Sequence, residues 1–323
     1  MSESEEIICT LFEGNFHLGV VGLANSLHAV GFKGALIAGY RGDLPTWCSP
    51  LKGQRIGELD VQTFQAKALT IHFVEVQTDY HLTNYKPDFL MLAAAAFPKA
   101  KRLYYFDPDI VLTSTWDYYQ AWIESGVALC ADINSPIPKS HPQRIAWRRY
   151  FAERGFELNF KDSIYVNGGF VGLRREQMDF LQLWQVLQEV MAPSIGGLNK
   201  SSIGKSGTPR PVAEDAIDAF RKTDQDALNA TVEAYTGEFS MIGQEAMAFG
   251  PGKTQMAHSQ GRYKPWSKAY FHTTLIGRPP SFAEKEYWKH VSSPIQLISP
   301  LKLKLIQFKL SLCAFIGRFY RRA

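Results

Sequence analysis

Short apolar runs alternate with stretches of helical spacing at the start of the chain. Residues 7–12 form an apolar run typical of a buried strand. Residues 18–30 have helical spacing, with Leu23, Leu27 and Val30 on one face, and Gly31 predicts the end of this helix. Residues 35–40 are again apolar and predict the next strand. Strand and helix alternating at this spacing favour a parallel sheet with helices on its faces.

The same pattern continues through the middle of the chain. It predicts strands over residues 69–76, 102–106, 127–131 and 165–173, the last interrupted by Gly168 and Gly169, and helices over 86–96 and 177–191. Residues 192–210 are poor in large apolar side chains and contain 4 glycines, which predicts a mobile surface insert. We therefore expect one α/β domain over residues 1–290, followed by an appendage over residues 300–323.

The composition is that of a large globular protein in a reducing environment. The chain has 323 residues, of which 46% are hydrophobic and 20% charged, so it can form a sizeable core. The first six residues are mostly polar and acidic, unlike a secretory leader. The 4 cysteines are far apart and never form a Cys-x-x-Cys pair, so they predict neither a disulfide framework nor a cysteine zinc site. A cytoplasmic location is the resulting expectation.

Basic charge is concentrated at the C-terminal end. The formal net charge is +4, and residues 300–323 contain 6 basic side chains and no acidic one, so +4 − 6 leaves −2 for the remainder. A surface that binds nucleic acid is therefore not expected on the body of the protein. The basic residues of the tail are Lys302, Lys304, Lys309, Arg318, Arg321 and Arg322.

Apolar residues of the tail share one helical face. They are Leu301, Leu305, Phe308, Leu312, Ile316 and Phe319. The longest uncharged run, residues 310–317, is too short for a membrane span, which needs about 20 residues. The pattern favours a basic amphipathic helix that attaches the protein peripherally to an anionic membrane surface, at its inner face. A final core helix with a solvated basic edge is the alternative.

The most distinctive local motif is Asp107-Pro108-Asp109, directly after the apolar run 102–106. Residues two apart in an extended backbone point to the same side, so both carboxylates can bind one hard cation. Ligands of open α/β sheets gather at the carboxyl ends of the strands, where this pair is expected. Asp and Pro are also common turn residues, so a turn without a metal is the alternative interpretation.

Two further clusters contain groups that complement such a metal site. His258 adds a neutral ligand to two carboxylates, and Lys264 offsets the charge of a diphosphate. Gly261 lets the backbone approach phosphate oxygens, while Asn167 and Gly168 combine an amide with a backbone that a sugar can approach. The plainer interpretations are loop residues for the first cluster and a strand bulge or close packing for the second.

A fourth cluster is the run Thr223-Asp224-Gln225-Asp226. Thr223 and Asp226 have the spacing of a capping box before a helix that continues from Ala227. Asp224 and Gln225 would then lie at a helix N-terminus, where contacts to polar ligands are common. The run therefore predicts a helix cap that also offers ligand contacts.

Taken in order, these motifs resemble glycosyltransferase family 8, the retaining transferases that include bacterial lipopolysaccharide galactosyl- and glucosyltransferases and glycogenin. The resemblance covers roughly residues 7–270, and it implies a GT-A nucleotide-diphospho-sugar transferase fold with a mostly parallel central sheet flanked by helices. Its segments are the opening strand, Asp107-Pro-Asp109, Asn167-Gly-Gly, Asp224-Gln-Asp226 and His258-x-x-Gly261-x-x-Lys264-Pro-Trp.

The resemblance also implies a role for each cluster. Asp107, Asp109 and His258 would bind Mn²⁺ or Mg²⁺ on the diphosphate of the donor, and mixed carboxylate and imidazole ligands favour Mn²⁺. Besides Asp107, the donor-binding groups would be Thr10 and Leu11 at the uridine, Gly261 and Lys264 at the phosphates, Lys86 near a phosphate or the sugar, and Asn167 and Gly168 at the sugar. Asp224 and Gln225 would be the catalytic residues, with Gln225 near the anomeric carbon.

The implied function is transfer of a hexose, galactose or glucose, from a UDP-sugar to a glycan or glycolipid acceptor in cell-surface polysaccharide or lipopolysaccharide synthesis. Asp132 and Asn134 follow the predicted strand 127–131 and are candidate acceptor contacts, although a turn is equally compatible with them. The family more often has Asn-Ala-Gly or Asn-Ser-Gly where this chain has Asn-Gly-Gly, so Gly168 is a departure.

Two other functions compete with this interpretation. A nucleotidyltransferase shares strand-end carboxylates, but it usually needs a basic glycine-rich loop after the first strand, and residues 12–15 read Phe-Glu-Gly-Asn without a cation. A non-catalytic protein of the same fold, acting as a membrane-bound partner, is the second alternative. The intact set of carboxylates, histidine, amide and lysine argues against a degenerate site.

Overall fold

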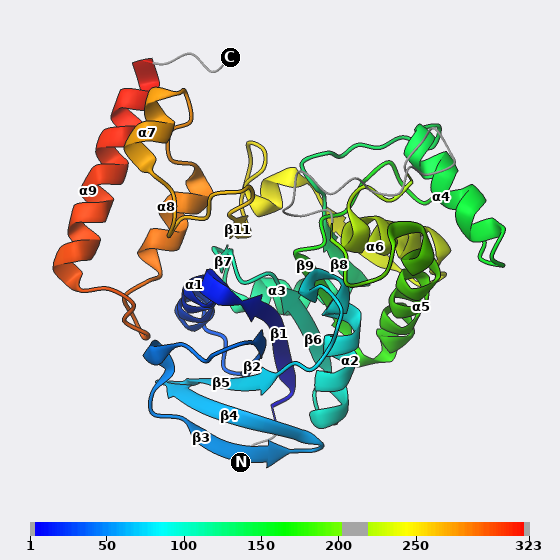
Figure 1. Ribbon diagram of the computed structural model, residues 1–323, viewed down its shortest axis with the longest axis horizontal. Helices are drawn as coiled ribbons and strands as arrows, with labels where there is room; N and C mark the ends of the chain where they lie inside the picture. The colour runs from blue at the N-terminus through cyan, green and yellow to red at the C-terminus, as the bar shows by residue number, and fades with distance from the viewer. Residues whose placement is uncertain (1–3, 202–218, 320–323) are drawn as a thin grey trace.

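The computed structural model describes residues 4–201 and 219–319, which form a mixed α/β domain (Figure 1). Its main sheet has nine strands in the order β10-β8-β9-β6-β1-β2-β5-β4-β3. The strands are β1 (Glu6–Glu13), β2 (Ala35–Arg41), β3 (Lys52–Ile56), β4 (Leu59–Ala66), β5 (Leu69–Glu75), β6 (Arg102–Phe106), β8 (Val127–Cys130), β9 (Phe170–Arg174) and β10 (Phe239–Ile242). A small second sheet pairs β7 (Ile110–Leu112) with β11 (Met256–His258).

Most of the main sheet runs in one direction. The strands β6, β1, β2 and β5 are parallel neighbours, with Ile7 opposite Ala35 and Glu6 opposite Arg102. Strand β9 is antiparallel to its neighbours β6 and β8, and β4 is antiparallel to its neighbours β5 and β3. Among the described strands of this sheet, β9 and β4 are therefore the two that run in the opposite direction to the others, β10 being parallel to β8. This architecture confirms the mostly parallel sheet that the alternating pattern predicts.

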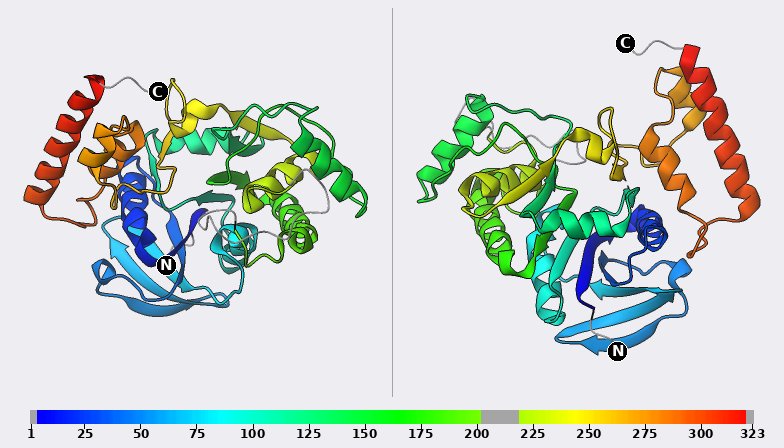
Figure 2. Two further views of the ribbon diagram at one scale, coloured as in Figure 1. Left: turned by 45° about the horizontal axis from the view of Figure 1, so that its top comes forward. Right: turned by 180° about the vertical axis from the view of Figure 1, so that it is seen from behind.

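Helices cover both faces of the sheet because β1 is apolar on both sides. Ile7, Cys9 and Leu11 pack in one cluster with α2 and α5, whereas Ile8 and Phe12 pack in the other with α1 and α3. Figure 2 shows the helices on the two sides of the sheet. The helices are α1 (His17–Ala29), α2 (Lys86–Ala96), α3 (Trp116–Ile123), α4 (Pro142–Ala152), α5 (Met178–Ile195), α6 (Thr223–Ala234), α7 (Tyr270–Leu275), α8 (Phe282–Lys289) and α9 (Pro300–Ile316).

Two predicted boundaries are wrong. The strand expected over 165–173 begins at Phe170, because the preceding residues pair with the end of β8 instead of with β6. Val166 forms a bridge with Ala131, and the Asn167 N–H donates to the Cys130 carbonyl at 2.8 Å. The insert expected from residue 192 overlaps the end of α5, which continues to Ile195. Residues 198–200 are also held in place, because the Asn84 amide donates to the carbonyls of Leu198 and Lys200, each at 2.8 Å. Residues 202–210 of the insert lie outside the described part of the chain.

The C-terminal helices form one packed unit at the edge of the domain. On α9 the buried side chains Leu310 and Cys313 pack in one cluster with Tyr270 of α7 and Tyr287 of α8. The opposite side of α9 carries the predicted apolar stripe, and its members Leu301 and Phe308 remain 71% and 69% exposed (Figure 1). Within residues 4–201 and 219–319, no helix has the length and apolar character to cross a membrane.

Candidate metal and donor site

The two aspartates lie in a turn that joins the two sheets. After β6 ends, the Asp107 N–H donates to the Gly169 carbonyl at 2.8 Å, and the Ile110 N–H donates back to the Asp107 carbonyl at 3.1 Å. Helix α1 packs closely against this turn. A Cβ atom on Gly19 would lie 2.5 Å from the Pro108 carbonyl oxygen, so only glycine permits this approach.

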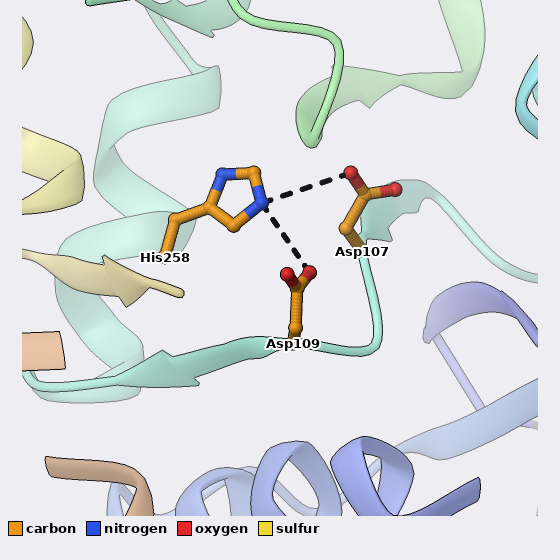
Figure 3. A group of neighbouring side chains, drawn as sticks. All are labelled: Asp107, Asp109 and His258. Carbon is orange, nitrogen blue, oxygen red and sulfur yellow. Dashed lines mark ion pairs between the residues drawn. The ribbon is translucent and has the colours of Figure 1, made fainter. Parts of the chain in front are cut away.

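His258 meets the aspartates from the neighbouring strand. It is the last residue of β11 and pairs with Ile110 of β7, which places its ring beside the turn. Its Nε2 atom lies 3.3 Å from Asp109 Oδ1 and 3.9 Å from Asp107 Oδ2 (Figure 3). One ligand atom from each residue falls within 4.8 Å of the others, as one shared cation requires.

The donor set fits a divalent cation. Two carboxylates with one imidazole suit Mn²⁺ better than an all-oxygen site would. The other ring nitrogen, His258 Nδ1, is buried and has no hydrogen-bond partner in the part of the chain that the structure describes. Metal-binding histidines usually donate this second N–H to a protein group or a water. The described residues provide no such protein group for His258.

Lysines balance the charge of both aspartates. Lys264 Nζ lies 2.6 Å from Asp109 Oδ2 and donates to the Ser259 carbonyl at 3.0 Å. Although burial disfavours the charged carboxylate, Lys264 and His258 hold the pKa of Asp109 well below its usual range. Asp109 is therefore ionised at neutral pH, as metal binding requires.

Lys86 is buried in the centre of the site. It is the first residue of α2, and its ammonium lies 3.1 Å from Asp107 Oδ1, 3.1 Å from Asp224 Oδ2 and 2.8 Å from the Gly168 carbonyl. Burial alone would lower the pKa of Lys86, but the two carboxylates outweigh it and raise the pKa. Lys86 thus links the metal-binding turn to the amide segment and to α6.

Gln225 contacts the Asn-Gly-Gly segment from the first turn of α6. Its Oε1 accepts from the Gly168 N–H at 3.3 Å and from Asn167 Nδ2 at 3.5 Å, whereas its Nε2 is buried without a partner among the described residues. The predicted capping box is wrong, because α6 already begins at Thr223 with Lys222 as the N-cap. Thr223 instead donates its hydroxyl hydrogen to Asn84 at 3.1 Å.

Asp132 is fully buried and central to a second polar group. It accepts from Asn167 Nδ2 at 2.7 Å, from Lys222 Nζ at 3.1 Å, from the backbone N–H of Asn134 at 3.0 Å and from Gln260 Nε2 at 3.4 Å. Burial favours its neutral form, but the Asn134 N–H and Lys222 hold the pKa of Asp132 below its usual range. Sequence reasoning did not single out Lys222 or Gln260, because both are distant from Asp132 in the chain.

Three of the predicted donor contacts lie apart from this network. Thr10 and Leu11 are inside β1, opposite Ala38 and Gly39, and both side chains are buried in the sheet. Gly261 has a φ of 101° and open space around its Cβ position, so the backbone conformation, rather than crowding, requires glycine there. The roles predicted for these residues stay predictions.

Gly169 should be essential to the geometry of the metal ligands. A Cβ atom at this position would lie 2.8 Å from His258 Cε1 and 3.0 Å from Asp107 Oδ2. We expect Gly169→Ala to weaken Mn²⁺ binding by about tenfold or more, as disturbed ligand orientation does. Isothermal titration with Mn²⁺ measures this effect. Gly53→Ala, where the nearest atom is 3.5 Å away, is the matched control, and equal affinities in both variants would contradict the expectation.

The fold is similar to those of solved glycosyltransferases. The structure of galactosyltransferase LgtC, in complex with donor and acceptor sugar analogues, matches with a TM-score of 0.50 and 11% identity over 91% of this chain and 98% of that chain. Glycosyltransferase GlyE of Streptococcus pneumoniae matches with a TM-score of 0.51 and 11% identity. The match covers 96% of this chain and 64% of the GlyE chain. These likenesses confirm the predicted GT-A fold. Neither a protein-family model nor a curated protein sequence matches the chain.

Proposed function

We propose that the protein transfers a hexose, galactose or glucose, from a UDP-sugar to a glycan or glycolipid acceptor with the help of a divalent metal. The observation that carries this proposal is the convergence of Asp107, Asp109 and His258 on one point, beside two lysines, in a fold shared with glycosyltransferases. The LgtC structure, which holds donor and acceptor sugar analogues, supports a sugar donor and a sugar acceptor.

In this proposal, different groups around the metal ligands stabilise the leaving diphosphate and orient the donor sugar. A bound Mn²⁺ would offset the negative charge that develops on the leaving diphosphate. Lys264 holds a second positive charge at Asp109, and Lys86 holds a third between Asp107 and Asp224, so both would help to stabilise the same charge. Gln225, whose Nε2 has no described partner, would orient the donor sugar at its anomeric carbon.

A donor-binding experiment tests this proposal. The purified protein is heated with each of a panel of nucleotide sugars, with and without Mn²⁺, and released UDP is measured in parallel. We expect thermal stabilisation by one UDP-sugar only when Mn²⁺ is present, together with slow UDP release. No stabilisation by any nucleotide or metal would overturn the transferase function and leave the fold without an assigned activity.

We also propose that α9 attaches the protein to an anionic membrane surface, where a glycolipid acceptor would be found. Its exposed stripe of large apolar side chains lies on a helix that also carries three lysines, a combination found in interfacial helices. Deleting residues 300–323 would also uncover the cluster that Leu310 and Cys313 complete, so point substitutions on the exposed side are the better test.

Introducing two negative charges into the exposed apolar stripe of α9 should weaken the binding of the protein to vesicles. Leu305 and Phe308 are 63% and 69% exposed, so Leu305→Glu with Phe308→Glu should leave the fold intact and weaken binding to vesicles rich in phosphatidylglycerol by about tenfold or more. Vesicle sedimentation measures the bound fraction. The control pair, Leu51→Glu with Ile145→Glu, adds the same charge elsewhere, and equal release by both pairs would refute a specific role of α9.

A further inference from the structure

A cavity of about 370 Å³ lies between α9 and the body of the domain. Its apolar lining includes Trp266, from the loop after Lys264, Trp288 of α8 and Ile306 of α9. Lys302 and Lys309 also line it, one helical turn on either side of Ile306. The cavity therefore combines aromatic and aliphatic walls with two ammonium groups on a single helix.

The two lysines of α9 that line the cavity are available for an anion. Within the described residues neither Lys302 nor Lys309 has a carboxylate within 4.0 Å, and Lys309 instead lies 5.3 Å from the Phe271 ring. By contrast, Lys268, which also lines the cavity, is paired with Glu284 at 2.6 Å. Residues 300–323 contain no acidic side chain, so no negative charge on this segment opposes an anionic ligand.

The surface around the cavity is apolar. Helix α7 packs against α9 (Figure 2). Phe271 and Leu275 of α7 and the following Ile276 are exposed, as is the apolar stripe of α9. A ligand with an anionic head and an apolar body would match both the lysines and these walls. A sugar nucleotide would match the charge and could stack on the aromatic rings, but it has no apolar chain to cover the aliphatic lining.

We propose that this cavity binds one anionic phospholipid, with its phosphate at Lys302 and Lys309 and its acyl region against Trp266, Trp288 and Ile306. The proposal extends the membrane attachment proposed above, but it does not require the sugar-transfer activity. Trp266 is two residues beyond Lys264, which pairs with Asp109, so a lipid bound here would lie next to the candidate metal site.

A short-chain lipid separates a defined site from general attraction to a charged surface. Dihexanoyl phosphatidylglycerol is titrated into the full chain below the concentration at which it forms micelles, without metal or nucleotide, and heat is measured. We expect saturable binding of one molecule per chain. Dihexanoyl phosphatidylcholine and glycerol phosphate should each bind at least about tenfold more weakly, because one lacks the net charge and the other the acyl chains.

Paired substitutions on the same helix test the site itself. Lys302→Ala with Lys309→Ala should weaken binding about tenfold or more, whereas Lys304→Ala with Arg318→Ala removes equal charge outside the cavity and should change it less than about twofold. Thermal unfolding verifies that both variants are folded. No saturable binding by the wild type, equal loss in both variants, or equal binding of glycerol phosphate would each overturn the proposal, whatever the transferase assay shows.

Discussion

Asp109→Asn should remove metal-dependent donor binding while leaving the fold in place. Asp109 is buried, lies 3.3 Å from His258 Nε2 and is kept ionised by its neighbours. Asparagine has nearly the same shape but no charge, so Mn²⁺ loses an anionic ligand. We expect Mn²⁺ affinity to fall by at least about a hundredfold, beyond the effect of disturbing an outer-shell partner, with a parallel loss of UDP release.

Titration calorimetry with Mn²⁺ and a UDP-release assay on the same preparation give both quantities. Asp117→Asn is the control, because Asp117 is exposed in the first turn of α3 and makes the same chemical change away from the site. A variant at position 109 that is inactive yet binds Mn²⁺ normally would show that Asp109 is not a metal ligand.

Lys86→Met should destabilise the protein and abolish activity together. Lys86 is 2% exposed and its ammonium touches two carboxylates, so methionine preserves much of the side-chain volume but leaves both negative charges without this partner. Removing one member of a buried ion pair typically costs about 3–5 kcal/mol of unfolding free energy. Denaturant unfolding measures this loss, which we expect to exceed that of any exposed lysine.

Two comparisons make this prediction specific. Lys101→Met breaks an ion pair with Glu5 in which both side chains are mostly exposed, and it should cost less than about 1 kcal/mol. Adding Asp224→Asn to Lys86→Met removes one of the stranded charges, so the double variant should be more stable than Lys86→Met alone. A double variant no more stable than the single one would show that loss of packing, not stranded charge, causes the destabilisation.

Local pattern predicted the central elements well where the chain is uniformly apolar or clearly bounded. The bounds of α2 and β6 match their predictions, since Pro87 lies within the first turn of the helix and the residues of β6 after Arg102 are hydrophobic up to Asp107. The hairpin of β3 and β4 was not predicted, because no residue of β3 is buried and β4 has no continuous apolar run. Helix α4 was missed for a similar reason, since it carries three arginines.

The candidate site shows a different limit of sequence reasoning. The motifs give the types of group, and two of the contacts that the resemblance implied, between His258 and the aspartates, are seen as short distances. Lys222 precedes α6 and pairs with Asp132, which follows β8. This contact depends on how α6 packs beside β8, and no local sequence pattern predicts that packing. Likewise, Asn167 is turned toward Asp132 because β9 starts later than the apolar pattern suggests.

The small sheet of β7 and β11 has a consequence for biosynthesis. Lys264 lies 155 residues after Asp109, and β11 is what brings His258 to the aspartates. A nascent chain that has emerged only as far as α6 therefore carries both carboxylates but neither the imidazole nor the lysine that completes the cluster. Chains cut between α6 and β11 would retain most of the main sheet yet lack His258 and Lys264. Under the proposed function such chains would not hold the metal, and the metal content of a preparation would report the fraction of molecules synthesised and kept intact past residue 264.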